Sequence, residues 1–137
     1  MKKIFTIFIT VIIVLCLTAC SGVSKVDIDY GSSSIYSQSD MDSAIKLIKN
    51  EFSTWKGCKL HNIRYSSDKC SSEENIKWMN DLGDEDIVFT QCIEFVSDFH
   101  SSKSGGEGFE ADTEYTDWQW WLARTDNGEW NLVTWGY

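Results

Sequence analysis

The chain has 137 residues, with 12 lysines and arginines against 21 aspartates and glutamates, which gives a formal net charge of −9 at pH 7. This length suits a single domain with one hydrophobic core. The negative charge argues against binding to nucleic acid and against lying flat on anionic lipid, because both interactions need patches of Lys and Arg.

A short positive segment followed by an apolar run opens the sequence. Lys2 and Lys3 precede residues 4–17, which are apolar except for two threonines and a cysteine. This order is typical of a secretory signal. Fourteen residues of helix span about 21 Å, which is short for a hydrocarbon core of roughly 30 Å, so a permanent membrane span is disfavoured.

The end of that run carries a more specific motif. The order Leu-Thr-Ala-Cys, ending at Cys20 and followed by Ser-Gly, resembles the lipobox of bacterial lipoproteins. The resemblance implies that residues 1–19 are a signal peptide and that Cys20 becomes the lipid-bearing N-terminus. Two or more acyl chains hold a protein stably on a bilayer. We therefore expect an extracytoplasmic protein, anchored by lipid to the outer face of the cell membrane; an ordinary signal with a chance cysteine is the alternative.

Removal of the signal changes the charge and leaves a polar segment before the domain. Loss of residues 1–19 takes away two lysines and leaves ten basic against 21 acidic residues, a net charge of −11. The lipid, and not surface charge, must then hold the protein at the membrane. Residues 20–34 are rich in Ser, Gly and Asp and predict a flexible linker after the lipidated cysteine. Residues 35–137 are predicted to form one domain.

Two amphipathic helices are predicted in that domain. Residues 39–55 carry apolar side chains at helical spacing, with Ser37 or Ser39 as the cap and Gly57 as the stop. Residues 58–65 predict a short strand. A second helix is predicted within residues 71–83, where a serine and a glutamate have capping-box spacing. The apolar stripe of the longer helix consists of Ile45, Ile48, Phe52 and Trp55.

Strands dominate the C-terminal half. From residue 86 the apolar residues alternate, which predicts a long strand with one dry face. Residues 100–117 predict a loop by their glycines and charges. Two further strands, 115–125 and 129–137, are joined by Asp-Asn-Gly, a strong hairpin signal. The dry face of the long strand consists of Ile87, Phe89, Ile93, Phe95 and Phe99.

Together these elements predict an α+β fold, with one long and one shorter helix packed on a curved antiparallel sheet of about four strands. The hairpin carries five of the seven tryptophans, and both of its faces bear large rings. One face must cover the long helix, and the other lines a pocket, meets a partner or is covered by the second helix. The rings are therefore either core or a ligand platform, such as one that stacks on sugars.

Several stretches carry a family resemblance. The segments IYSQSDMDSAIKLIKNEF, GCKLHNIRYSSDK and YTDWQWWLARTDNGEWNLVTWGY resemble parts of uncharacterised small lipoproteins and secreted domains of Gram-positive bacteria. The order of elements resembles the cone-shaped α+β fold of nuclear-transport-factor-like, SnoaL-like and cystatin-like proteins. That resemblance implies a variable pocket between the curved sheet and the long helix, and it implies no particular substrate.

Candidate functional residues are few. His61 and Glu94 could form an acid/base pair inside such a pocket, and a structural histidine is the alternative. Cys58 and Cys70 flank a predicted strand and are a candidate disulfide in an oxidising compartment. The candidates for ligand binding are Trp121, Trp135 and Arg124.

No metal site and no cofactor are predicted. Three cysteines without Cys-x-x-Cys spacing are poor zinc ligands. The acidic loop does not have the spacing of an EF-hand, which favours a solvated loop. The motifs Gly-x-Ser-x-Gly and His-Glu-x-x-His and the phosphate-binding loop do not occur in the sequence. The carboxylates of the acidic loop are Glu107, Glu110, Asp112, Glu114 and Asp117.

Three functional hypotheses follow. The first is a non-enzymatic, lipid-anchored module that binds a wall glycan, a peptide or a protein partner, and it predicts exposed aromatic rings beside a shallow cavity. The second is a small cone-fold enzyme, which requires His61 and Glu94 to meet in one pocket. The third is an acidic interaction or immunity-like protein that masks a basic partner, in a complex that high salt should weaken.

Overall fold

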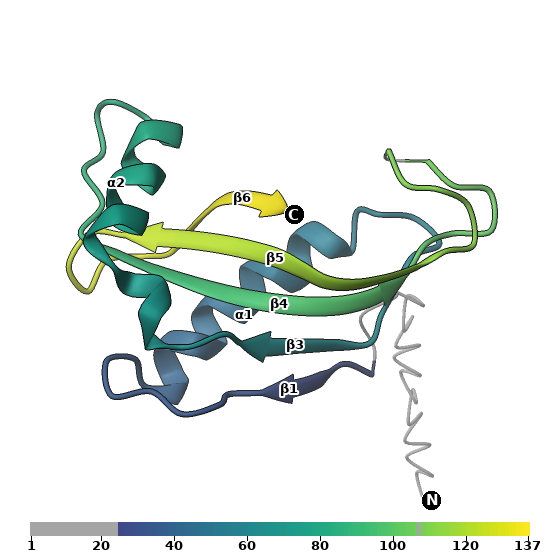
Figure 1. Ribbon diagram of the computed structural model, residues 1–137, viewed down its shortest axis with the longest axis horizontal. Helices are drawn as coiled ribbons and strands as arrows, with labels where there is room; N and C mark the ends of the chain where they lie inside the picture. The colour runs from purple at the N-terminus through teal and green to yellow at the C-terminus, as the bar shows by residue number, and fades with distance from the viewer. Residues whose placement is uncertain (1–24, 107) are drawn as a thin grey trace, which may run out of the picture.

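The computed structural model describes residues 25–106 and 108–137, and it confirms the α+β class. The helices are α1 (Gln38–Phe52) and α2 (Glu73–Leu82), with a 3-10 turn, η1 (Asp68–Ser71), before α2. The strands form one mixed sheet in the order β1-β3-β4-β5-β6 (Figure 1). Strand β2 pairs with β4 outside this order. Their bounds are β1 (Asp27–Asp29), β2 (Lys59–Leu60), β3 (Asn62–Tyr65), β4 (Gln91–His100), β5 (Glu114–Arg124) and β6 (Asn131–Gly136).

The predicted signal sequence and Cys20 lie outside the described residues. Within residues 25–106 and 108–137, no helix has both the length and the apolar character that a membrane crossing requires.

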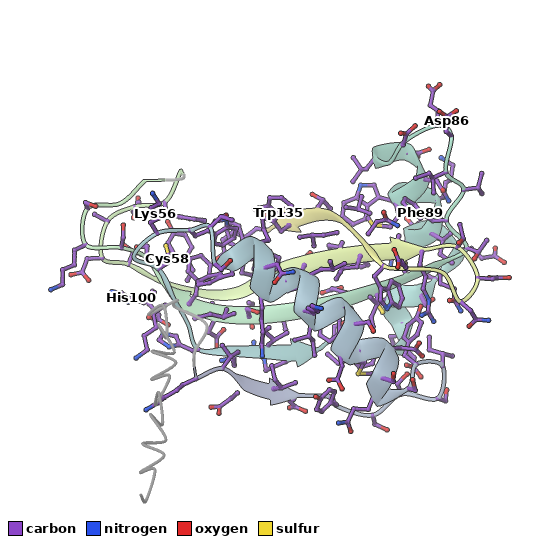
Figure 2. All side chains as sticks on the ribbon, turned by 180° about the vertical axis from the view of Figure 1, so that it is seen from behind. Lys56, Cys58, Asp86, Phe89, His100 and Trp135 are labelled. Carbon is purple, nitrogen blue, oxygen red and sulfur yellow. The ribbon has the colours of Figure 1, made fainter. Side chains whose placement is uncertain are left out.

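Helix α1 begins at a capping box and lies across one face of the sheet. The Ser37 hydroxyl accepts a hydrogen bond from the Asp40 backbone, and the Asp40 carboxylate accepts one from the Ser37 backbone. Figure 2 shows α1 in front of the sheet. The buried residues of α1 recur at helical spacing, so one apolar stripe faces the sheet. The predicted helix is confirmed, with Ser37 as its cap, but it ends at Phe52 and not at Trp55. The buried stripe consists of Met41, Ala44, Ile45, Ile48 and Phe52.

The central strands β4 and β5 carry the core. Along β4 every second residue from Ile93 to Phe99 is fully buried, which confirms the predicted dry face over this range. Ile87 was predicted on the same face, but it lies before the strand and is 39% exposed. The strand begins at Gln91 and not at residue 86 as predicted. The reason is that the Asn80 side chain binds both backbone groups of Phe89, at 2.7 Å and 3.0 Å, in place of a neighbouring strand.

The β5–β6 hairpin is confirmed, and its two faces have different partners. Trp120 is fully buried on the α1 side and stacks on Trp55, with ring centroids 5.2 Å apart. Trp121 lies on the other side, against Trp78 of α2 at 5.2 Å. Helix α2 therefore covers part of the face opposite α1. The sequence left open whether this face lines a pocket, meets a partner or is covered by the second helix. At Trp121 it is covered by the second helix.

The predicted flexible linker is wrong for residues 27–34. Strand β1 pairs in parallel with β3, so the sheet is mixed and not purely antiparallel as predicted. The next residues are tied down by Asp68, whose carboxylate accepts hydrogen bonds from the Ser33 hydroxyl at 2.5 Å and the Ser34 backbone at 2.9 Å. The domain therefore begins before residue 35. The polar composition of residues 20–34 masked the three side chains of this segment that pack against the core, Val26, Ile28 and Tyr30.

Candidate functional site

A groove lined by aromatic side chains lies at the C-terminal end of α1. It has a volume of about 460 Å³ and is called the aromatic groove below. One wall comes from the end of α1 and the residues after it, one from the loop between β4 and β5, and one from the ends of β5 and β6. The lining residues are Glu51, Trp55, Gly108, Phe109, Tyr115, Trp118, Trp135 and Tyr137.

The rings of the groove differ in their exposure. Trp55 is 5% exposed and belongs to the core, whereas Trp135 is 40% exposed and Tyr137 is 77% exposed. The pairing of β5 with β6 places Trp135 opposite Trp120. Tyr137 lies 5.1 Å from Trp118 in an edge-on contact. Figure 2 shows Trp135 on β6 beside α1. Two ring surfaces are therefore open to solvent above a floor of packed rings.

Two polar groups accompany these rings. The Nε1 atom of Trp118 is buried and has no hydrogen-bond partner, and it is the one buried side-chain nitrogen or oxygen in this state among the described residues. Leaving a buried donor unpaired costs about 1–3 kcal/mol. The Glu51 carboxylate lies at the same groove and accepts a long hydrogen bond of 3.4 Å from Trp55 Nε1. Because this atom has almost no solvent-accessible surface, a ligand that offers it an acceptor would remove that cost after a covering side chain moves.

A second cavity, of about 690 Å³, lies between α1 and the β5–β6 turn. Arg124 forms part of its lining and is 6% exposed. The guanidinium donates to Gln91 at 2.7 Å and to Asp40 at 2.9 Å, and it lies 4.2 Å from the ring centre of Trp130. These contacts hold Arg124 in one orientation. The lining residues are Ser43, Lys46, Leu47, Asn50, Arg124, Asn127, Gly128, Glu129 and Trp130.

The three residues predicted to bind ligand therefore lie in three different places. Trp135 lines the aromatic groove, and Arg124 lines the second cavity. Trp121 was predicted to bind ligand, but it is 7% exposed and packs under α2, so it serves the core. The sequence did not single out Trp118, Tyr137 or Phe109. The alternation of Trp118 with Trp120 was a signal for the first, whereas the place of Phe109 depends on the path of a long loop.

The predicted acid/base pair is not brought together. His61 Nε2 lies 2.8 Å from a carboxylate oxygen of Glu114. The His61 backbone N–H donates to the Asp98 carbonyl, and the Ser66 backbone N–H donates to the Glu94 carbonyl. The paired residues Arg64 and Val96 lie between these two contacts along the sheet, so His61 and Glu94 are separated. Desolvation raises the pKa of Glu94. The enzyme hypothesis loses the dyad on which it was based.

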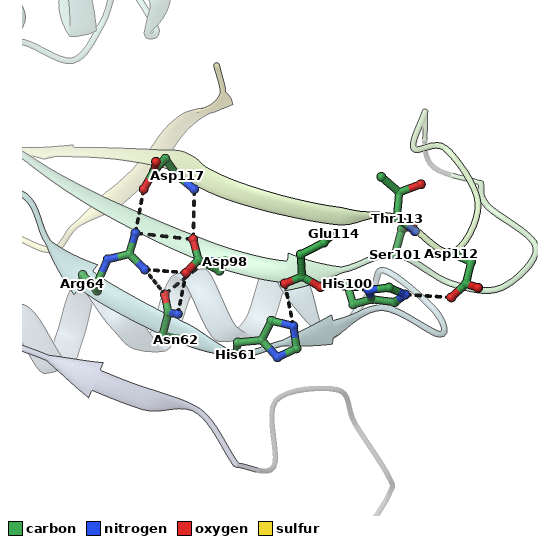
Figure 3. Close-up of polar contacts among 10 residues, drawn as sticks. All are labelled: His61, Asn62, Arg64, Asp98, His100, Ser101, Asp112, Thr113, Glu114 and Asp117. Atoms are coloured by element: carbon green, nitrogen blue, oxygen red, sulfur yellow. Dashed lines mark hydrogen bonds and ion pairs between the residues drawn. The ribbon is translucent and has the colours of Figure 1, made fainter.

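His61 instead belongs to a row of polar side chains on the sheet face opposite α1 (Figure 3). His100 extends that row, with Nδ1 2.8 Å from Glu114 and Nε2 2.7 Å from Asp112. In residues 25–106 and 108–137, no group of three His, Cys, Asp or Glu side chains is arranged to hold a metal ion. The row acts as a clasp that links Glu114 of β5 to His61, between β2 and β3, to His100 of β4 and to Asp112 of the acidic loop.

A second network on the same face surrounds Asp98. Arg64 binds Asp98 at 2.9 Å and Asp117 at 2.8 Å, and Asn62 donates to Asp98 at 3.0 Å (Figure 3). Asp117 has a φ of 56°, in the left-handed region, where the pairing of β4 with β5 shifts its register. The Asp98 carboxylate accepts the Asp117 backbone N–H at 3.0 Å, which stabilises this irregularity. Arg64 thus has a structural role.

The histidine clasp predicts a pH dependence of stability. Hydrogen bonds with Asp112, and next with Glu114, raise the pKa of His100. Its contribution is then fully present below the unfolded value of about 6.5 and is lost as the pH rises through the higher folded value. We expect His100→Gln to lower the melting temperature at pH 6 and to have little effect at pH 9. Thermal melts of both proteins across this range test the prediction, and a difference that does not change with pH contradicts it.

The predicted Cys58–Cys70 disulfide is not present in the described residues, where Cys58, Cys70 and Cys92 are all buried. Cys70 lies instead beside Cys92, whose thiol donates to the Cys70 carbonyl at 3.1 Å. Burial raises the pKa of the Cys70 thiol, and it raises the pKa of Cys92 to about 12. Because thiolates are the reactive form, these buried thiols are poor nucleophiles at neutral pH.

Comparison with known proteins gives no relative: no family model, no curated protein and no solved structure matches this chain.

Proposed function

We propose that this chain is a non-enzymatic, lipid-anchored, extracytoplasmic module that binds a saccharide in the aromatic groove. The observation that carries the proposal is the exposed pair Trp135 and Tyr137 next to the unpartnered Nε1 of Trp118. A pyranose ring has an apolar C–H face and a rim of hydroxyl groups. It can lie on an exposed aromatic ring while a hydroxyl oxygen accepts from the indole N–H and another hydroxyl donates to Glu51.

Location supports this choice of ligand. If Cys20 is lipidated, as the lipobox resemblance implies, the domain lies outside the membrane, where the glycan of the cell wall surrounds it. The acidic surface of the chain is no obstacle, because a neutral sugar is recognised by ring stacking and hydrogen bonds. Membership of the cone-fold superfamily stays a prediction, and the proposal does not depend on it.

Calorimetric titration with an N-acetylglucosamine tetramer tests the proposal. The full chain is purified in a detergent without a sugar headgroup, so that the detergent does not compete. Trp135→Ala is expected to weaken binding by about tenfold or more, as loss of an aromatic hot spot does. Trp78→Ala is the matched control, because Trp78 is also 40% exposed but lies on α2, away from the groove.

Two results would count against a saccharide site. One is that no neutral or acidic wall-type oligosaccharide binds. The other is that a wall peptide without sugars binds and loses its affinity in Trp135→Ala, which would assign the groove to peptides.

A further inference from the structure

The aromatic groove and the second cavity share the same two walls. Helix α1 contributes Lys46 and Asn50 to the second cavity and Glu51 to the aromatic groove. On the β6 side, Trp130, just before the strand, lines the second cavity, and Trp135 lines the aromatic groove. The two cavities therefore lie at opposite ends of one seam between α1 and β6, which is called the α1–β6 seam below.

The seam is longer than a single sugar ring. The eight helical steps from Ser43 to Glu51 rise about 12 Å along α1, and the six residues of β6 extend about 20 Å. Strand β6 is also at the edge of the sheet, so the seam is not closed by a further strand. This shape suits a linear chain of sugars that lies along the seam.

The end of the seam near the β5–β6 turn is lined by positively charged side chains, which the aromatic end does not have. Lys46 and Arg124 line it against one carboxylate, Glu129, although the chain as a whole has a net charge of −9. Asp40 offsets part of the Arg124 charge. A guanidinium has five N–H groups, and the bonds to Gln91 and Asp40 use two of them. Trp130 covers the guanidinium at 4.2 Å, so its orientation is set before a ligand arrives.

We propose that the α1–β6 seam binds a linear oligosaccharide that carries a carboxylate, with that carboxylate at Lys46 and Arg124 and its neutral rings at the aromatic groove. This inference rests on the proposed saccharide function and adds the chemical class of the ligand. Arg and Lys recognise carboxylates by charge-assisted hydrogen bonds, and the aromatic rings hold the uncharged sugars. A glycan in which N-acetylglucosamine alternates with N-acetylmuramic acid, which bears a lactyl carboxylate, has this character.

Two tetrasaccharides of equal length separate the two proposals. One alternates N-acetylglucosamine with N-acetylmuramic acid, and the other contains only N-acetylglucosamine. Calorimetry on the full chain is expected to show tighter binding of the acidic tetrasaccharide, by about threefold to tenfold, as one partly exposed charge contact allows. Lys46→Gln should remove most of that preference, and it should weaken the neutral tetrasaccharide much less than the acidic one.

Two further variants complete the experiment. Glu129→Gln removes the carboxylate of the same cavity and should enlarge the preference for the acidic ligand. Lys49→Gln is the matched control, since it makes the same change three residues later on α1 at a side chain outside this cavity. Lys46 and Glu129 are exposed, so neither substitution disturbs the core.

The possible outcomes distinguish failure of the carboxylate subsite from failure of the saccharide function. Equal affinity for the two tetrasaccharides, or a preference that Lys46→Gln leaves intact, overturns the carboxylate subsite while the aromatic groove stands. Failure of both ligands to bind overturns the saccharide function and the subsite together.

Discussion

Trp120→Ala is expected to lower the free energy of unfolding by about 3–5 kcal/mol, whereas Trp135→Ala lowers it by less than about 1 kcal/mol. The two rings are paired across β5 and β6 with centroids 6.2 Å apart, so the same substitution is made at adjacent places. Trp120 is fully buried, stacks on Trp55 and donates from Nε1 to the buried Ser97 hydroxyl at 3.1 Å. Its loss leaves a cavity and an unpaired hydroxyl.

Urea unfolding followed by circular dichroism measures both values. In the stability measurement, Trp135→Ala is the control for Trp120→Ala. In the saccharide-binding measurement, Trp135→Ala is the test variant, and it should weaken binding although the protein stays folded. The division of the tryptophans into core and ligand surface is wrong if Trp135→Ala destabilises the domain as much as Trp120→Ala does.

Asp40→Asn is expected to have the second largest effect on stability, a loss of about 2–3 kcal/mol at pH 7. The carboxylate pairs with Arg124 at 2.9 Å, and the Arg124 side chain is only 7% exposed. Removal of one partner leaves a buried charge without its counterion, which costs about 3–5 kcal/mol in a fully buried pair. The value is reduced here because the Asp40 side chain is 29% exposed. Asparagine keeps the shape of the α1 cap.

The pH dependence of this pair has a defined sign. Desolvation opposes ionisation of Asp40, but the hydrogen bonds from Ser37 and Arg124 outweigh it and lower the pKa of the carboxyl. Its contribution is therefore present above the unfolded value of about 3.9 and is lost as the pH falls through the lower folded value. The difference between wild type and Asp40→Asn in chemical unfolding should shrink in acid.

Asp117→Asn is the control for Asp40→Asn. Its carboxylate also pairs with an arginine, Arg64, at 2.8 Å, but its side chain is 77% exposed. Exposed ion pairs contribute at most about 1 kcal/mol. Equal losses in the two variants would show that burial of Arg124 does not decide the effect.

The features predicted well from the sequence are those with a long repeat. The stripe from Ile45 to Phe52 and the alternation from Ile93 to Phe99 each sample a period several times, and both match the structure. The Asn-Gly turn fixes the hairpin for a local reason, since Asn127 adopts a φ of 52°. Strand β1 escaped prediction because three residues are too few to show a period.

The candidate site was harder to predict for physical reasons. His61 lies at the break between β2 and β3. The β4–β5 pairing also shifts its register near Asp98. Because of these two irregularities, the alternation of residues does not predict which side chains contact each other. His61 therefore meets Glu114 and not Glu94. The aromatic groove joins residues from α1, a long loop and two strands, and only their three-dimensional packing places Phe109 beside Trp118, at 5.5 Å.

A single NMR titration tests the saccharide site most directly. The seven tryptophans of the chain give seven indole N–H signals, which report on each ring separately. On addition of the N-acetylglucosamine tetramer, we expect the signals of Trp118 and Trp135 to shift, with that of Trp118 moving as its unpartnered N–H gains an acceptor, while those of Trp78 and Trp121 stay in place. Unchanged Trp118 and Trp135 signals at saturating ligand, or shifts confined to Trp78 and Trp121, would contradict a saccharide site in the aromatic groove.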